Sequence, residues 1–182
     1  MFNSTPGLDG LITWAADRFT AAGLTPPTVT EVSFYGEHLD VCKGIHGLAT
    51  GTTLALCFVE KTACTDPATC TQWTAQAKAT TLHELGHIWI WAGLDTHTLD
   101  DDTTRRFTKQ ARLPTWADTD HAWRYRGMEL AASTISWALT DDPFVHPIFA
   151  ERCNELGDLF TTLTGKPAPT TAQCPEVSSH PA

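Results

Sequence analysis

The sequence predicts an α+β fold, in which a small mixed sheet packs on a long central helix and is followed by a helical C-terminal part. Two short runs rich in β-branched and aromatic residues lie in the first third of the chain, at 28–35 and 52–59. Apolar residues with helical spacing dominate the rest. The chain has 182 residues, which suits one hydrophobic core and therefore one domain.

The N-terminal part predicts one helix followed by two strands. Apolar residues recur at helical spacing over 8–22, and Gly23 stands where a C-terminal cap belongs. The two runs at 28–35 and 52–59 are predicted strands, and the second is apolar on both faces. Four glycines between positions 36 and 51 predict a loop that joins these strands.

The other predicted elements are helices. Asp66 and Pro67 indicate the start of a long helix that runs to about Ala92 and is closed by Gly93. A short helix is predicted at 103–111, a second long helix at 123–139 and a third at 147–163. Residues 166–182 are rich in Pro, Thr and Ser and predict an extended tail, so the domain is expected to span residues 1–165.

Composition and charge exclude several classes of function. Hydrophobic residues make up 42% of the chain and charged residues 18%, which excludes a disordered chain. The net charge of −9 repels phosphate groups, and no apolar run is long enough to cross a bilayer. We therefore expect no nucleic-acid partner and no membrane span, and we expect a monomer.

The six cysteines bear on the compartment in which the protein works. Their even number and the absence of a CxxC pair favour disulfides over a second metal site. Pairing of sequence neighbours predicts the bonds Cys42–Cys57, Cys64–Cys70 and Cys153–Cys174. The N-terminus lacks the features of a signal peptide, so either a leader has been removed or the protein stays inside the cell. Disulfides favour a secreted or cell-surface protein, and the alternative is six reduced cysteines in the cytosol.

The residues that carry chemistry are His83, Glu84 and His87, in the HELGH segment of the long helix. Residues four apart lie on one face of a helix, so the two imidazoles can reach one ion. Glu84 lies one step round, where a base must be to take a proton from metal-bound water. Imidazole suits zinc, and three protein ligands with an open fourth position are typical of a catalytic site. The alternative is two core histidines that form ordinary hydrogen bonds.

Glu129 is the preferred third ligand. It lies on the predicted helix 123–139, whose same face carries small residues that would allow tight packing on the histidine helix. A buried glutamate on such a face needs a partner, and a zinc ion is a suitable one. Asp95, His97 and His121 remain alternative ligands, and Glu129 could instead pair with Arg126 at the surface.

Two segments, TLHELGHIW at 81–89 and RGMELAASTISWAL at 126–139, resemble the gluzincins, and especially short actinobacterial metallopeptidases of the minimal zincin type. The resemblance covers about a third of the chain. It implies a zincin-like fold and a zinc metallopeptidase with one zinc ion per chain. It also implies that His83, His87 and Glu129 are the zinc ligands and that Glu84 is the general base.

This chain departs from the family pattern at two positions. The family usually has Asn before the ligand glutamate, where this chain has Met128, and Asp four residues after it, where this chain has Ser133. The Ser133 hydroxyl can still accept a hydrogen bond from the first histidine, although more weakly than a carboxylate. Zinc affinity or activity is therefore expected to be lower than in the large gluzincins.

The resemblance further implies an edge strand that binds an extended substrate, and residues 52–59 are the candidate. A residue that stabilises the transition state should face the zinc across the cleft. His121, Tyr125, Arg124 and His146 are candidates for that role, and a surface role explains each of them equally well.

The expected function is hydrolysis of peptide bonds in a peptide or protein substrate, with a zinc-bound water activated by Glu84. One alternative is a non-catalytic binding or interaction module on the zincin fold, which the serine at position 133 motivates. Another is a zinc amidase that acts on cell-wall peptides, because the zinc chemistry is the same and specificity lies in the loops of the cleft.

Overall fold

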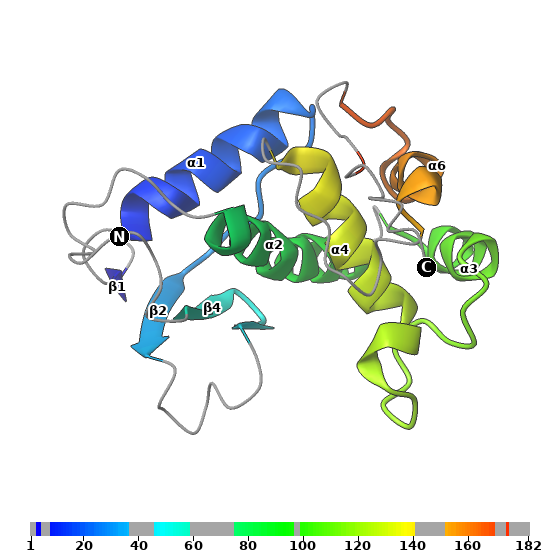
Figure 1. The fold of residues 1–182 in the computed structure, drawn as a ribbon, viewed down its shortest axis with the longest axis horizontal. Helices are drawn as coiled ribbons and strands as arrows, with labels where there is room; N and C mark the ends of the chain where they lie inside the picture. The colour runs from blue at the N-terminus through cyan, green and yellow to red at the C-terminus, as the bar shows by residue number, and fades with distance from the viewer. Residues whose placement is uncertain are drawn as a thin grey trace, which may run out of the picture.

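The chain folds into helices that pack around a small mixed sheet (Figure 1). The structure is a computed structural model that describes residues 3–4, 8–36, 46–58, 75–96, 99–140, 152–169 and 174. Its elements in chain order are β1 (Asn3–Ser4), α1 (Leu8–Ala21), β2 (Glu31–Gly36), β3 (Gly47–Thr50), β4 (Thr53–Phe58), α2 (Ala75–Asp95), α3 (Asp101–Gln110), the 3-10 turn η2 (Trp123–Tyr125), α4 (Gly127–Leu139) and α6 (Cys153–Thr164). The α+β class predicted from the sequence is confirmed.

The sheet has the strand order β1-β2-β4-β3. β2 is parallel to both β1 and β4, and β3 is antiparallel to β4. The prediction that residues 52–59 form an edge strand is therefore wrong, because β4 is paired on both sides. Part of the predicted loop at 36–51 forms the edge strand β3, which reaches β4 through a tight turn where Gly51 has a φ of 59°.

α2 is the central helix of the fold. In Figure 1 it lies between α1 and α4, and it packs on both of them and on β3 and β4. Leu82, Leu85 and Ile90 of α2 are almost completely buried in the core. The helix continues past its predicted end at Ala92 as far as Asp95, because Gly93 is buried inside it and does not act as a cap. The predicted start at Asp66 lies outside the described residues.

α2 and α4 approach one another closely at Gly86. A Cβ atom built on Gly86 would lie 3.1 Å from Ala132 Cα and 3.2 Å from the Ala132 carbonyl oxygen. One turn further along each helix, the buried Ser136 hydroxyl donates to the Ala79 carbonyl at 2.7 Å. The small side chains at this contact let the two helices bring their polar faces together.

We expect Gly86→Val to lower the free energy of unfolding by about 1–3 kcal/mol, because the added side chain meets the backbone of α4. The matched control is Gly157→Ala in α6, where a new Cβ would meet only a Trp137 ring atom at 3.9 Å. That control should gain about 0.5–1 kcal/mol, since alanine is the better helix former. Urea unfolding of both variants measures the difference, and a Gly86→Val protein as stable as the wild type would contradict the close packing.

The single helix predicted at 123–139 is divided into η2 and α4 at Arg126. Arg126 pairs with Thr115 in an isolated parallel bridge, and the Gly127 amide donates to the Thr115 carbonyl. A Cβ atom at Gly127 would lie 2.8 Å from the Trp116 ring. These contacts with a distant segment hold Arg126 in an extended conformation, and the first turn of α4 therefore begins at Gly127.

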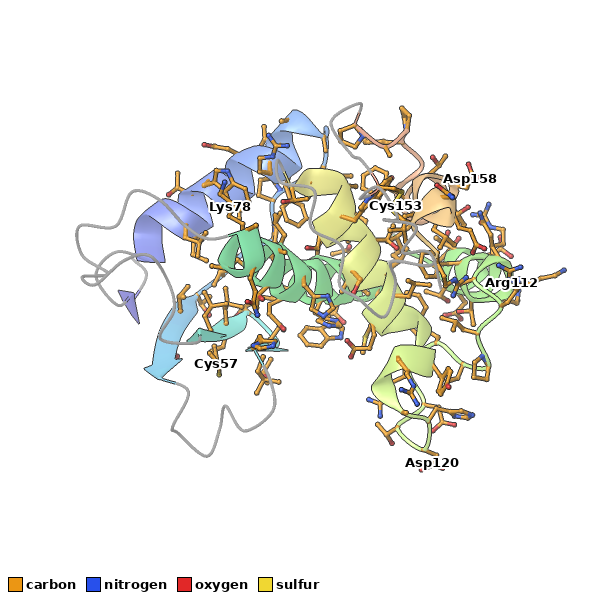
Figure 2. The ribbon with its side chains drawn as sticks, viewed as in Figure 1. Cys57, Lys78, Arg112, Asp120, Cys153 and Asp158 are labelled. Carbon is orange, nitrogen blue, oxygen red and sulfur yellow. A yellow bond between two sulfur atoms is a disulfide. The ribbon has the colours of Figure 1, made fainter. Side chains whose placement is uncertain are left out.

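α6 and the tail are joined by the disulfide Cys153–Cys174, which confirms one predicted pairing. α6 ends at Gly165, whose φ of 69° is the left-handed conformation expected of a cap. Cys57 lies in the sheet, away from Cys153 (Figure 2), and is also disulfide-bonded, with a partner outside the described residues. The predicted pairings Cys42–Cys57 and Cys64–Cys70, and the predicted helix start at 147, involve residues outside the described ranges.

The helices were also compared with the requirements of a bilayer. Among the described residues, none of them combines the length and the apolar character needed for a membrane crossing.

Candidate metal centre

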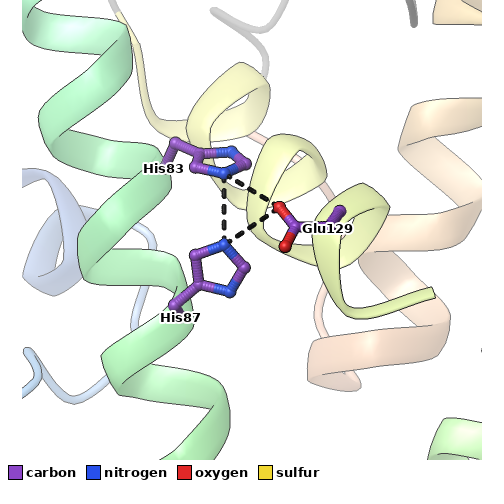
Figure 3. Close-up of side chains that lie close together, drawn as sticks. All are labelled: His83, His87 and Glu129. Carbon is purple, nitrogen blue, oxygen red and sulfur yellow. Dashed lines mark hydrogen bonds and ion pairs between the residues drawn. The ribbon is translucent and has the colours of Figure 1, made fainter. Parts of the chain in front are cut away.

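His83 and His87 face Glu129 across the contact between α2 and α4 (Figure 3). The two histidines lie one turn apart on α2, and Glu129 lies in the first turn of α4. The Nε2 atoms of His83 and His87 are 3.2 Å apart. Glu129 Oε2 lies 3.5 Å from His83 Nε2 and 3.2 Å from His87 Nε2. The three side chains therefore direct one nitrogen or oxygen atom each at a common point.

The spacing of these atoms fits a tetrahedral metal ion. Zinc binds nitrogen and oxygen ligands at about 2.0–2.2 Å, so two ligands of a tetrahedral ion lie roughly 3.3–3.6 Å apart. The three observed separations are 3.2, 3.2 and 3.5 Å, close to one face of such a tetrahedron. Two imidazoles and one carboxylate could hold zinc or another divalent first-row ion, so the donor set leaves the identity of the metal open.

The Glu129 carboxylate is charged in this setting. Its burial raises the pKa, but hydrogen bonds from His83 and His87 outweigh that effect and hold the pKa of Glu129 well below its ordinary value. A metal ligand must be deprotonated, so the charged carboxylate suits that role at neutral pH.

The Glu84 side chain is buried beside the two histidines and is 7% exposed. Burial raises the pKa of Glu84, while the nearby His83 and His87 rings oppose the rise. Glu84 is not a member of the metal-binding group identified among the described residues. The carboxyl group is therefore next to the candidate centre but leaves the three ligand positions to other side chains.

The two histidine rings are held in different ways. Ser133 Oγ lies 3.1 Å from His83 Nδ1, and if this nitrogen carries the proton, the hydroxyl accepts it and leaves the Nε2 lone pair for a metal. His87 Nδ1 is buried and has no hydrogen-bond partner among the described residues. The His87 ring instead stacks on Trp91, with centroids 5.8 Å apart. A hydroxyl thus orients one ring, and an aromatic side chain supports the other.

We expect Ser133→Ala to weaken zinc binding by roughly 10–100-fold, because the hydrogen bond that orients His83 is lost. Ser136→Ala on the same helix is the matched control, since that hydroxyl bonds the Ala79 carbonyl and not a histidine. The control should lower stability by about 1 kcal/mol without changing zinc affinity. Competition with a zinc indicator dye measures both affinities, and equal affinities would remove this role from Ser133.

The alternative third ligands lie elsewhere or outside the described residues. Asp95 is exposed at the end of α2, and neither it nor His121 belongs to the metal-binding group found in the described part of the chain. His97 lies outside the described residues. Arg126, considered as a surface partner of Glu129, instead donates to the Thr119 and His121 carbonyls.

The candidates for transition-state stabilisation are on the loop before α4. His121 Nδ1 lies 3.4 Å from Asp118 Oδ2. The Tyr125 side chain is exposed, and the Arg124 guanidinium lies over its ring. Figure 2 shows the neighbouring Asp120 at the tip of this loop, away from α2. His146 lies outside the described residues, so no candidate for this role is brought to the centre among the residues described.

The sequence prediction missed the contact between β3 and Glu84. A Cβ atom built on Gly47 would meet only atoms of Glu84 at its three shortest distances. The signal that could have revealed β3 is Gly51, two residues before the strongest strand, since such a glycine is typical of a tight hairpin turn.

Comparisons of the chain with models of protein families, with curated proteins and with solved structures give no match. The function of the chain therefore has to be inferred from the chemistry of its own residues.

Proposed function

We propose that this protein is a zinc-dependent peptide-bond hydrolase with a zincin-like fold. The observation that carries the proposal is the triangle formed by His83 Nε2, His87 Nε2 and Glu129 Oε2, with separations of 3.2 to 3.5 Å. The buried carboxyl group of Glu84 lies beside that triangle without being part of it. Three ligands and a neighbouring base are the components that metal-assisted hydrolysis requires.

His83, His87 and Glu129 would hold the zinc ion, which would polarise the substrate carbonyl and lower the pKa of a coordinated water to about 7. Glu84 takes a proton from the attacking water and passes it to the nitrogen of the leaving amine. Its buried position beside two histidines keeps bulk water away from the carboxyl group and favours direct transfer. Ser133 holds the His83 ring in the orientation that ligation needs.

The edge strand that receives the substrate is β3, which replaces the strand first assigned to this role. The Cys57 amide donates to the His46 carbonyl, so the register pairs Leu48 with β4 and turns the main-chain groups of Gly47 and Ala49 away from it. An extended peptide can add to such a free edge through main-chain hydrogen bonds. The Cys153–Cys174 disulfide fits an oxidising compartment, which supports a secreted or cell-surface protein.

Two other functions share part of this support. A zinc amidase acting on cell-wall peptides would use the same ligands and the same base. A non-catalytic binding module is favoured by one specific observation, the buried His87 Nδ1 that has no hydrogen-bond partner among the described residues. A histidine oriented so weakly could hold zinc for structure instead of catalysis.

Digestion of a peptide library with the zinc-loaded protein, read by mass spectrometry, tests the proposal. We expect cleavage of ordinary peptide bonds that stops when a chelator is added and returns when zinc is restored. Cleavage of cell-wall muropeptides alone would identify the amidase. Stoichiometric zinc without cleavage of either substrate would identify the binding module.

A further inference from the structure

Gly47 of β3 lies directly against the side chain of Glu84. A Cβ atom built on Gly47 would be 2.6 Å from Glu84 Cγ, 2.8 Å from Oε1 and 3.0 Å from Cδ. Real Cβ atoms do not approach other heavy atoms so closely. The Glu84 side chain therefore occupies the space that any side chain at position 47 would need.

The backbone gives no other reason for a glycine at this position. Among the described glycines, those with positive φ are Gly23, Gly51 and Gly165, so Gly47 has a conformation that other residues can adopt. Glycine weakens a strand, and inside one it often marks a place where another group approaches closely. Here the approaching group is the carboxyl-bearing side chain of Glu84.

Ala49, two residues further along β3, holds the same carboxyl group. Its backbone N–H donates a hydrogen bond to Glu84. The register explains why this donor is available, since Leu48 pairs with Ala55 of β4 and the N–H of Ala49 points to the free edge. β3 thus contacts Glu84 at two points, with a surface that lacks a side chain at Gly47 and a donor at Ala49.

We propose that Gly47 is a positioning residue that acts through Glu84, setting the place of its carboxyl group with the help of the Ala49 N–H. This inference rests on the proposed function, because it assigns to Glu84 the role of general base. An added methyl group at position 47 must displace Glu84. The displaced atoms belong to a side chain with rotatable bonds, so the fold itself can accommodate the change.

The kinetic test is Gly47→Ala. We expect kcat to fall by roughly 10²-fold, as for a displacement of a reacting group by about 1 Å, with KM, zinc content and melting temperature unchanged. Gly10→Ala is the matched control, because a Cβ at Gly10 in α1 would meet nothing within 4 Å. In a Glu84→Gln background, Gly47→Ala should cause no further loss, since both changes act on the same group.

A second measurement does not depend on activity. Amide hydrogen exchange by NMR should show the Ala49 N–H protected in the wild type and unprotected in Glu84→Ala and Gly47→Ala, while the Leu48 N–H stays protected in all three. Loss of zinc or of stability together with kcat would overturn the proposal in favour of a merely structural glycine. Unchanged kcat in Gly47→Ala would also overturn it. If the wild type cleaves no peptide, the proposed function fails by itself, and retained Ala49 protection in Gly47→Ala would then overturn the positioning role.

Discussion

Glu84→Gln is expected to reduce peptide hydrolysis by roughly 10²–10⁴-fold while zinc remains at about one ion per chain. Glutamine has nearly the same shape as glutamate but cannot accept a proton from water. Glu84 is separate from the three metal-binding side chains, so the change leaves the ligands in place. Turnover of the best library peptide and zinc content by plasma mass spectrometry, measured on one preparation, check the two halves of this prediction.

The matched control for Glu84→Gln is Glu155→Gln on α6. Glu155 pairs with Arg112 and Arg152 far along the chain from the centre, so its neutralisation removes a carboxylate without touching the proposed base. The control should cleave at the wild-type rate. Wild-type activity in Glu84→Gln would eliminate Glu84 as the base, whereas joint loss of zinc and activity would make it a support of the metal.

The part of the site that lies within one helix could be predicted from the sequence. His83 and His87 are four residues apart, and helical geometry alone puts them on one face. Glu129 needed a further step, because its position depends on how α4 packs against α2. The small residues of that helix face were enough to predict the contact, and Gly86 and Ala132 now lie within van der Waals reach across it.

The parts that the sequence did not reveal depend on contacts between distant segments. β3 has only four residues and a glycine at its start, and it becomes a strand because β4 offers it a partner. The division of the predicted helix at Arg126 likewise comes from pairing with Thr115. Local propensity contains neither contact, which is why β4 was taken for the edge and the neighbour of Glu84 was missed.

The ligand variants His83→Ala and Glu129→Ala are expected to lose zinc. If the three ligands share a binding free energy of about 10 kcal/mol, removal of one costs about 3 kcal/mol, or on the order of 10²-fold in affinity. After dialysis against a weak chelator, the wild type should retain about one zinc ion per chain, and each variant should retain almost none. Asp95→Ala and His121→Ala are the controls, because these side chains lie outside the metal-binding group of the described residues.

Melting temperatures extend the ligand test to a readout that needs no substrate. Zinc that binds only the folded protein stabilises it by RT ln(1 + [Zn]/Kd), so chelation should lower the melting temperature of the wild type and of the two controls. The same treatment should leave His83→Ala and Glu129→Ala almost unchanged, since they start without metal. Zinc retained in Glu129→Ala but lost in His121→Ala would move the third ligand to the loop before α4. A wild type that neither binds zinc nor responds to chelation would reduce the three side chains to an ordinary hydrogen-bonded group, because Glu129 can accept from both histidines without a metal.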